Sequence, residues 1–339
     1  ILKYNFSVYG NTGNTPYLNL LLLYLLLSSP VCLIEYIYLL RDRPHRIFQY
    51  GIYTFLAQLL LIMVPILLGK DIIWAIYGLL FITLVRWVWL ITLLFRYSEF
   101  RINPAFIKEH LRLGWPLIIT SLISGSAQYI DGIIVSAHFD DPSMFAIFRY
   151  GAKEFPLVLM LATGLNNALL PRFGTRTKIR ESLEVIKSKS RNLMHYLFPI
   201  SMVVLLFARW LYPRLFTPEF LRSADIFMIY ILLVIPRLLF PQTVIIGRKR
   251  TGVAMNAAIF ELVLNIPLSL WLVKDYGAVG VAVATFVVYF LSKVYLAAYL
   301  WIKMKIKPGE YIPLPTFFIY SVLLTILFVL IDHRIIDII

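Results

Sequence analysis

Nine ionisable side chains lie inside long apolar stretches of the sequence, and their chemistry gives the first clues to function. They are Glu35, Arg86, Asp131, Arg149, Lys153, Glu154, Arg237, Glu261 and Lys293. A charge within a membrane-spanning helix costs about 2.5 to 3.5 kcal/mol on insertion scales, so it faces the bundle interior, where it pairs, lines a water-filled path or contacts a ligand. If the apolar stretches span a membrane, binding and transport chemistry belongs to these nine residues.

Depth along the apolar stretches predicts two ion pairs. Arg237 and Glu261 lie ten and eleven residues from opposite ends of the basic turn at 247–250. With a rise of about 1.5 Å per residue, both sit about 15 Å from the same membrane face. Asp131 and Arg149 flank an outer turn at matching depth and form the second predicted pair.

Two basic residues have no acidic partner at matching depth. Arg86 lies ten residues from Arg96, near the midplane, and Lys153 follows Arg149 by one helical turn on the same face. Together with Arg237 and Arg149, they are the predicted substrate-binding cations of a cavity. For each of them the structural alternative is a buried pair, a hydrogen bond to the backbone, or snorkelling of the side chain to the interface.

The remaining intramembrane charges have other expected roles. Glu261, Asp131 and Glu154 are predicted to pair with the cations or to couple transport to an ion. Lys293 lies only eight residues from a cytoplasmic helix end, so we expect it to snorkel.

No catalytic or metal-binding arrangement is recognisable. The five histidines, at positions 45, 110, 138, 195 and 333, are scattered over loops and helix ends without HExxH spacing. The single cysteine, Cys32, allows neither an intramolecular disulfide nor a CxxC motif. We therefore expect no enzyme, no metal site and no cofactor.

Composition places the chain in the membrane. Of its 339 residues 60% are apolar and 15% are charged, and the mean hydropathy is +0.80, which excludes a water-soluble globular protein. The formal charge of +14 sits in short clusters between apolar runs, a pattern of cytoplasmic loops rather than of a nucleic-acid-binding face.

Ten stretches are long enough to span about 30 Å of hydrocarbon as helices. They are residues 17–40, 47–69, 72–95, 113–137, 144–170, 193–211, 225–246, 251–273, 278–300 and 316–331. Alternate loops carry 20 Lys and Arg residues on one side and six on the other, so the positive-inside rule places both ends of the chain outside. Because the chain starts at Ile1 without a signal-peptide pattern, we expect its N-terminus to be missing.

The domain organisation follows from the loops. Residues 1–97 are predicted to form a partial N-terminal bundle of three spans, and 98–112 an interfacial linker helix that begins with an N-cap at Asn103. Residues 113–300 form a six-helix bundle and 301–339 an additional helix. A weak repeat at a constant offset of 204 residues supports two homologous bundles.

Three segments carry a family resemblance. LRLGWPLIITSLISGSAQYIDGIIVSAHF (111–139) and FAIFRYGAKEFPLVLMLATGLNNALLPRF (145–173) resemble the paired helices that open the second bundle of polysaccharide flippases in the multidrug and oligosaccharidyl-lipid exporter superfamily. GRKRTGVAMNAAIFELVLNIPLSLWLVKDYGAVGVAVATFVVYF (247–290) is similar to a later pair of helices in the same family. No short motif of the family fixes the cavity cations.

The resemblance implies an all-α, two-bundle transporter fold of the MATE-like type, of which this chain lacks the first three helices. It further implies a flippase that moves an undecaprenyl-pyrophosphate-type, lipid-linked oligosaccharide across a bacterial or archaeal plasma membrane. The implied partners are this substrate, membrane lipids and a proton or sodium ion, without nucleic acid.

Two other functions stay open. A cation-coupled multidrug exporter of the same superfamily would have an acidic and aromatic cavity, whereas the spans hold five cations and four anions. A membrane-embedded glycosyltransferase or polymerase would need acidic residues in an outer loop, for which Asp140 and Asp141 are the only candidates. A tight turn is the simpler interpretation of these two residues.

Overall fold

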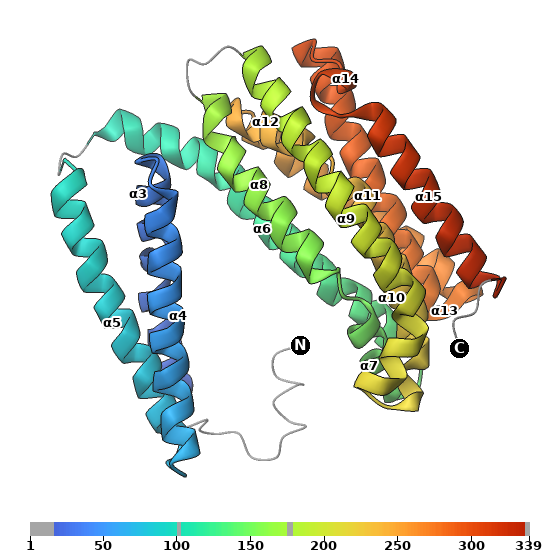
Figure 1. The fold of residues 1–339 in the computed structure, drawn as a ribbon, viewed down its shortest axis with the longest axis horizontal. Coiled ribbons are helices and arrows are strands. Elements are labelled where there is room, and N and C mark those ends of the chain that lie inside the picture. The colour runs from blue at the N-terminus through green and yellow to red at the C-terminus, as the bar shows by residue number, and fades with distance from the viewer. Residues whose placement is uncertain (1–16, 100–102, 175–178, 336–339) are drawn as a thin grey trace. The chain divides into compact units, whose positions relative to one another are not determined.

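A computed structural model describes residues 17–99, 103–174 and 179–335, and in these ranges it contains helices and turns without strands. The chain divides into two compact units, Ile1–Ile102 and Asn103–Ile339, which Figure 1 draws in blue to teal and in teal to red. The all-α class predicted from the apolar runs is confirmed.

Residues 17–99 of the first unit form four helices: α2 (Leu18–Val31), α3 (Leu33–Leu40), α4 (Pro44–Leu67) and α5 (Ile72–Tyr97). Only Cys32 separates α2 from α3, and the two together are long and apolar enough for one span. Trp87 and Trp89 on α5 anchor this span, since their indole N–H groups donate to Leu27 O at 2.8 Å and Tyr38 Oη at 3.0 Å. Three segments of this unit are therefore long and apolar enough to cross a membrane, and their assignment to a partial bundle stays a prediction.

The second unit contains the remaining elements. They are α6 (Pro104–His138), α7 (Pro142–Gly151), α8 (Pro156–Gly174), α9 (Ile179–Leu215), the 3-10 turn η1 (Pro218–Phe220), α10 (Leu221–Leu232), α11 (Val234–Arg237), α12 (Pro241–Gly247), α13 (Thr251–Met304), α14 (Pro308–Tyr311) and α15 (Leu314–Asp332). Its largest apolar core joins α8 to α13 and α15. In Figure 1 the long helices of this unit run side by side, and α15 packs on α9.

In the residues that the structure describes, seven helices are long and apolar enough to cross a membrane, or eight if a bent helix pair is one span. Two features account for the difference between eight and the ten predicted spans. The 54-residue α13 is interrupted at Gly277, whose backbone is left-handed with φ 59°, so one element covers two predicted spans. The predicted span 144–170 is split between α7 and α8. A total of ten crossings stays a prediction.

The linker is not a separate helix. Asn103 is the N-cap, as predicted, and its side chain accepts a hydrogen bond from Phe106 N at 3.2 Å. From Pro104, however, α6 continues without interruption to His138. Pro116 does not end the helix, because a proline removes one backbone N–H donor and bends a helix without necessarily breaking it.

Two helix breaks position the polar groups of the second unit. Residues 152–155 separate α7 from α8, just before Pro156, and α11 is separated from α12 by a bend of 49° just before Pro241. The α-helical backbone conformation is disfavoured for a residue that precedes a proline. These breaks place Glu154 and Arg237 at points where the regular helix ends.

Candidate functional site

A polar cavity of about 230 Å³ lies inside the second unit. It is bounded by α6, the break between α7 and α8, α10 to α12, and both halves of α13. Its ionisable lining residues are Asp131, Glu154, Tyr230, Arg237, Glu261, Tyr289 and Lys293. Most of the ionisable residues in the apolar helices of the second unit therefore line one cavity.

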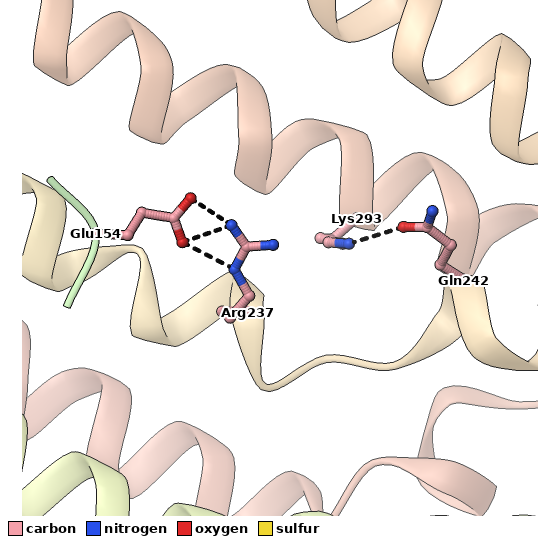
Figure 2. A network of polar contacts seen from close by, with 4 residues as sticks. All are labelled: Glu154, Arg237, Gln242 and Lys293. Atoms are coloured by element: carbon pink, nitrogen blue, oxygen red, sulfur yellow. Dashed lines mark hydrogen bonds and ion pairs between the residues drawn. The ribbon is translucent and has the colours of Figure 1, made fainter. Parts of the chain in front are cut away.

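The strongest contact in the cavity joins the two helix breaks. Arg237 donates to both carboxylate oxygens of Glu154, with Nε 3.0 Å from Oε2 (Figure 2). The guanidinium also lies over the Tyr289 ring, 4.8 Å from its centroid. A fork-shaped pair of this kind combines charge with fixed orientation, so it holds the two broken segments at a defined distance.

Lys293 also lies over the ring of Tyr289. Its side chain is buried, its Nζ donates to Gln242 Oε1 at 3.3 Å, and it lies 4.9 Å from the Tyr289 ring centroid. Glu261 lines the same cavity and interacts electrostatically with Lys293 and, more weakly, with Arg237. Figure 2 shows Arg237 turned to Glu154 and Lys293 turned to Gln242.

Asp131 forms a separate cluster deeper in the bundle. Its carboxylate is 1% exposed and accepts hydrogen bonds from Asn265 Nδ2 and Thr285 Oγ1, both at 2.7 Å. Ser269 donates to Asn265 Oδ1 at 3.1 Å. Within the described ranges no basic side chain forms an ion pair with Asp131. This buried carboxylate therefore has neutral partners only.

The charges around the cavity do not cancel. Three carboxylates and two basic groups line it, which leaves one formal negative charge in excess. A single monovalent cation, or one proton, would neutralise this excess. In the part of the chain that the structure describes, no group of three or more His, Cys, Asp or Glu residues could hold a metal ion.

Comparison with known families decides the identity of the fold. The sequence model of the family named lipid II flippase MurJ matches residues 28–336, which is most of the chain. The chain belongs to this family. No curated protein sequence matches at a significant level.

One solved structure supports the fold. The chain is similar to lipid II flippase MurJ in an inward closed conformation, at 19% identity and a TM-score of 0.56, over 93% of this chain and 68% of that one. Two further structures match with a TM-score of 0.46 each. One is a MOP superfamily transporter from Pyrococcus furiosus at 20% identity, covering 65% of this chain and 52% of its own. The other is a multidrug resistance MATE family transporter at 21% identity, covering 63% and 50%.

Membership of the MurJ family refines the resemblance seen in the sequence. A flippase rather than an enzyme is confirmed, whereas the polysaccharide flippases named by the resemblance are a related but different group. The multi-pass helical membrane fold is confirmed as well.

Neither predicted ion pair forms in this member of the MurJ family. Arg237 pairs with Glu154 rather than with Glu261. Asp131 takes neutral donors, while Arg149 lies over the Tyr129 ring at 5.2 Å. The number of residues from a helix end predicts the depth of a residue in the membrane, but it carries no information on the direction in which the side chain points.

Two lysines are also placed differently from the prediction. Lys153 lies in the non-helical break after α7, and its exposed side chain is not one turn below Arg149 on a continuous helix. Lys293 does not snorkel; it is buried against the cavity. Arg149 and Lys153 are absent from the lining of this cavity, so their role in ligand binding stays a prediction.

Arg86 belongs to the first unit. One guanidinium nitrogen donates to Gln58 Oε1 at 3.2 Å, and its buried Nε has no hydrogen-bond partner in the described residues. No acidic residue described by the structure forms an ion pair with Arg86. A cavity shared by Arg86 and Lys153 stays a prediction.

The acidic outer turn has a structural use. Asp141 is the N-cap of α7 and accepts hydrogen bonds from the Ser143 hydroxyl at 2.6 Å and from Ser143 N at 2.8 Å. These two bonds hold the pKa of the Asp141 carboxyl below its ordinary value. This agrees with a tight turn rather than a sugar-transfer site.

Among the cavity-lining residues, sequence reasoning missed Thr285 and Tyr289, and it named Lys293 but expected it to snorkel. A signal for them exists, because Thr285, Tyr289 and Lys293 follow at intervals of four residues and so share one helix face. Isolated hydroxyl and amide side chains are common in membrane helices, so this interval alone does not indicate a binding site.

Proposed function

We propose that this chain moves a lipid-linked saccharide of the lipid II type, with a pyrophosphate between lipid and sugar, across the bacterial plasma membrane. The observation that carries the proposal is the match of the MurJ family model over residues 28–336. The charged cavity and the two broken spans are consistent with a transporter, because broken helices in membranes occur where a cavity must form and close.

The substrate head group would be held by basic residues outside the cavity of the second unit. That cavity carries an excess negative charge and would repel a pyrophosphate. Arg149 and the exposed Lys153 lie at and beside the break after α7, and Arg86 has an unsatisfied buried nitrogen. Charge-assisted hydrogen bonds from such groups are the usual way in which proteins bind phosphate.

The Asp131 cluster would couple transport to a monovalent cation. One carboxylate with amide and hydroxyl neighbours offers hard oxygen atoms and a single negative charge, which suits a proton or a sodium ion better than a divalent metal. Occupation by either cation would remove the cost of a buried, unpaired carboxylate. This cluster is also where the excess charge of the cavity is buried most deeply.

The test is flipping of a lipid II analogue with a fluorescent head group in proteoliposomes, read by quenching from outside. We expect head-group translocation by the unmodified chain and its loss in Asp131→Asn, with unchanged membrane insertion. No translocation above empty liposomes would overturn the proposed substrate. Full activity of Asp131→Asn would overturn the coupling role alone.

A cation-coupled multidrug exporter is the second candidate, since its expected acidic and aromatic cavity agrees with the excess carboxylate and the two lining tyrosines, Tyr230 and Tyr289. The same proteoliposomes loaded with a lipophilic cationic dye distinguish the two. Dye export without head-group translocation would favour the exporter.

A further inference from the structure

A second polar cavity of about 190 Å³ adjoins the large one, and we call it the α8 pocket. It is lined by α8, by the segment from the end of α11 into α12, and by the second half of α13. Arg237, Gln242, Tyr289 and Lys293 line both cavities, but the carboxylates that line the large cavity do not line this one. Among the described residues, the charged groups of the α8 pocket are therefore two cations.

The two amide side chains of the α8 pocket have N–H donors to spare. Asn166 Oδ1 accepts a hydrogen bond from the Thr243 hydroxyl, and Gln242 Oε1 accepts one from Lys293 Nζ. A side-chain amide combines an acceptor oxygen with an NH₂ group that donates. Within the described ranges neither NH₂ group has a hydrogen-bond partner, so both are available to an acceptor in the pocket.

Lys293 is a buried cation without an ion pair. The residue is 7% exposed, and its hydrogen-bond partner, Gln242 Oε1 at 3.3 Å, is neutral. Glu261 acts on it electrostatically from the large cavity, but among the described residues no carboxylate lies within ion-pair distance of Nζ. A buried charge without a close counter-charge is costly, and an ammonium group has three N–H donors.

Arg237 contributes a further free donor. Its Nε and Nη2 donate to Glu154, whereas Nη1 has no hydrogen-bond partner in the part of the chain that the structure describes. Figure 2 shows this third nitrogen turned away from Glu154, on the side of Lys293. The α8 pocket thus brings together donor groups of two cations and two amides, without an anionic acceptor.

We propose that the α8 pocket binds a phosphate group, as free inorganic phosphate or as the phosphate of a lipid head group. The anion supplies the counter-charge that Lys293 lacks, and its oxygens accept charge-assisted hydrogen bonds. The donors come from α8, α11, α12 and α13, so a tetrahedral oxyanion can reach more of them than a planar carboxylate can. One water needs roughly 10 to 15 Å³, so the pocket has room for phosphate with ordered water.

The simpler alternative is that Glu261 balances Lys293 across the large cavity and that the α8 pocket holds water. Gln242→Glu distinguishes the two, because it places a carboxylate at the position that already accepts from Lys293. If Lys293 lacks a counter-charge, this variant is stabilised without phosphate and loses its response to phosphate. If Glu261 suffices, the added buried carboxylate destabilises the chain. Asn166→Asp removes the other NH₂ group and keeps an acceptor for Thr243.

The experiment measures the unfolding midpoint of the purified full chain in detergent. Phosphate replaces the bulky sulfonate of the buffer MES at constant pH and ionic strength, and equilibrium dialysis with radioactive phosphate gives the affinity. Farnesyl pyrophosphate, a prenyl pyrophosphate without sugar, is the lipid probe. Phosphate also stabilises proteins generally by exclusion from their surface, an effect that all variants share. Asn192→Asp, on an exposed part of α9, is the matched control for a gained carboxylate.

We expect a saturable, phosphate-dependent rise in midpoint for the unmodified chain and for Asn192→Asp. Phosphate should bind about tenfold or more weakly to Gln242→Glu and Asn166→Asp, because each loses a hydrogen bond to a charged group and gains a repulsive carboxylate. A saturable response to farnesyl pyrophosphate that Gln242→Glu removes would identify a lipid head group as a source of the phosphate, and a response to inorganic phosphate alone would identify the free anion.

Three results would overturn the proposal. They are the absence of a saturable shift with either probe, a shift of unmodified size in Gln242→Glu or Asn166→Asp, and a lowered midpoint of Gln242→Glu without phosphate. The proposal does not depend on the proposed transport substrate, because no step of this experiment measures translocation.

Discussion

Of the three carboxylates that line its cavity, Arg237 forms an ion pair with Glu154 alone. The reason is the break after α7, which frees Glu154 from a helix face and lets its carboxylate approach the guanidinium end-on. Glu261 stays on the regular helix α13 and lines the same cavity as Lys293, whose Nζ donates to Gln242. Among the three carboxylates, Glu154 is therefore the one that forms an ion pair in the described residues.

The fork between Arg237 and Glu154 predicts a non-additive pair of substitutions. Glu154→Gln or Arg237→Met alone leaves one partly buried charge without its partner and should lower the free energy of unfolding by about 3 kcal/mol. Glu154→Gln combined with Arg237→Met should recover most of that loss. Stability is measured by thermal unfolding in detergent, with insertion followed in parallel. Additive losses in the double variant would contradict the pairing.

At the scale of elements, α13 shows how one glycine can set the distance between two spans. Gly277 takes the left-handed conformation at the turn, and the chain then folds back closely enough that a Cβ on Gly280 would overlap the backbone carbonyl of Leu272. Backbone atoms cannot move aside as a flexible side chain can. The polar faces of the two halves therefore depend on a close approach that only glycine allows at position 280.

Gly280→Ala should therefore destabilise the second unit, by about 1 to 3 kcal/mol, the usual cost of overpacking. Gly164→Ala is the matched control, because a Cβ at that helical position meets nothing within 4 Å and alanine favours helix. The measurement is the shift in unfolding midpoint of each variant. Equal midpoints for the two variants would rule out the proposed close approach.

The helical elements could be predicted from the sequence because the length of an apolar run can be read directly along the chain. Asn103, for example, marked the start of α6 correctly. The partners within the cavity could not be predicted in the same way, since they depend on rotation about each helix axis and on where a helix breaks. Lys153 illustrates both limits, because the proline three residues later ends the helix that would have aligned it with Arg149.

At the scale of the whole molecule, the distribution of Lys and Arg between alternate loops fixes the orientation. With 20 such residues on one side and six on the other, the turn that contains Ser143 should face the outside. Ser143→Cys in a Cys32→Ser background should react with a membrane-impermeant maleimide added to intact cells. Ser188→Cys on α9 is the control for the opposite side. Labelling of position 143 only after permeabilisation would reverse the topology.

The proposed transport of an anionic head group predicts a role for basic residues in each of the two units. Arg86 has an unsatisfied nitrogen in the first unit, and Lys153 is an exposed cation in a helix break of the second. If both contact pyrophosphate, Arg86→Ala and Lys153→Ala should each slow head-group translocation by about tenfold or more, because each removes a charge-assisted contact of ~1.5 kcal/mol or more.

The conservative variants give the sharper result. Lys153→Arg should keep more activity than Lys153→Ala, because an ammonium acts chiefly as a point charge, whereas Arg86→Lys should be less well tolerated, because a lysine cannot reproduce the planar fork of an arginine. The measurement is translocation in proteoliposomes, normalised to inserted protein. If Arg86→Ala and Lys153→Ala both insert normally and transport at the unmodified rate, these residues do not bind the head group. The excess negative charge of the cavity in the second unit would then favour a cationic substrate for the chain.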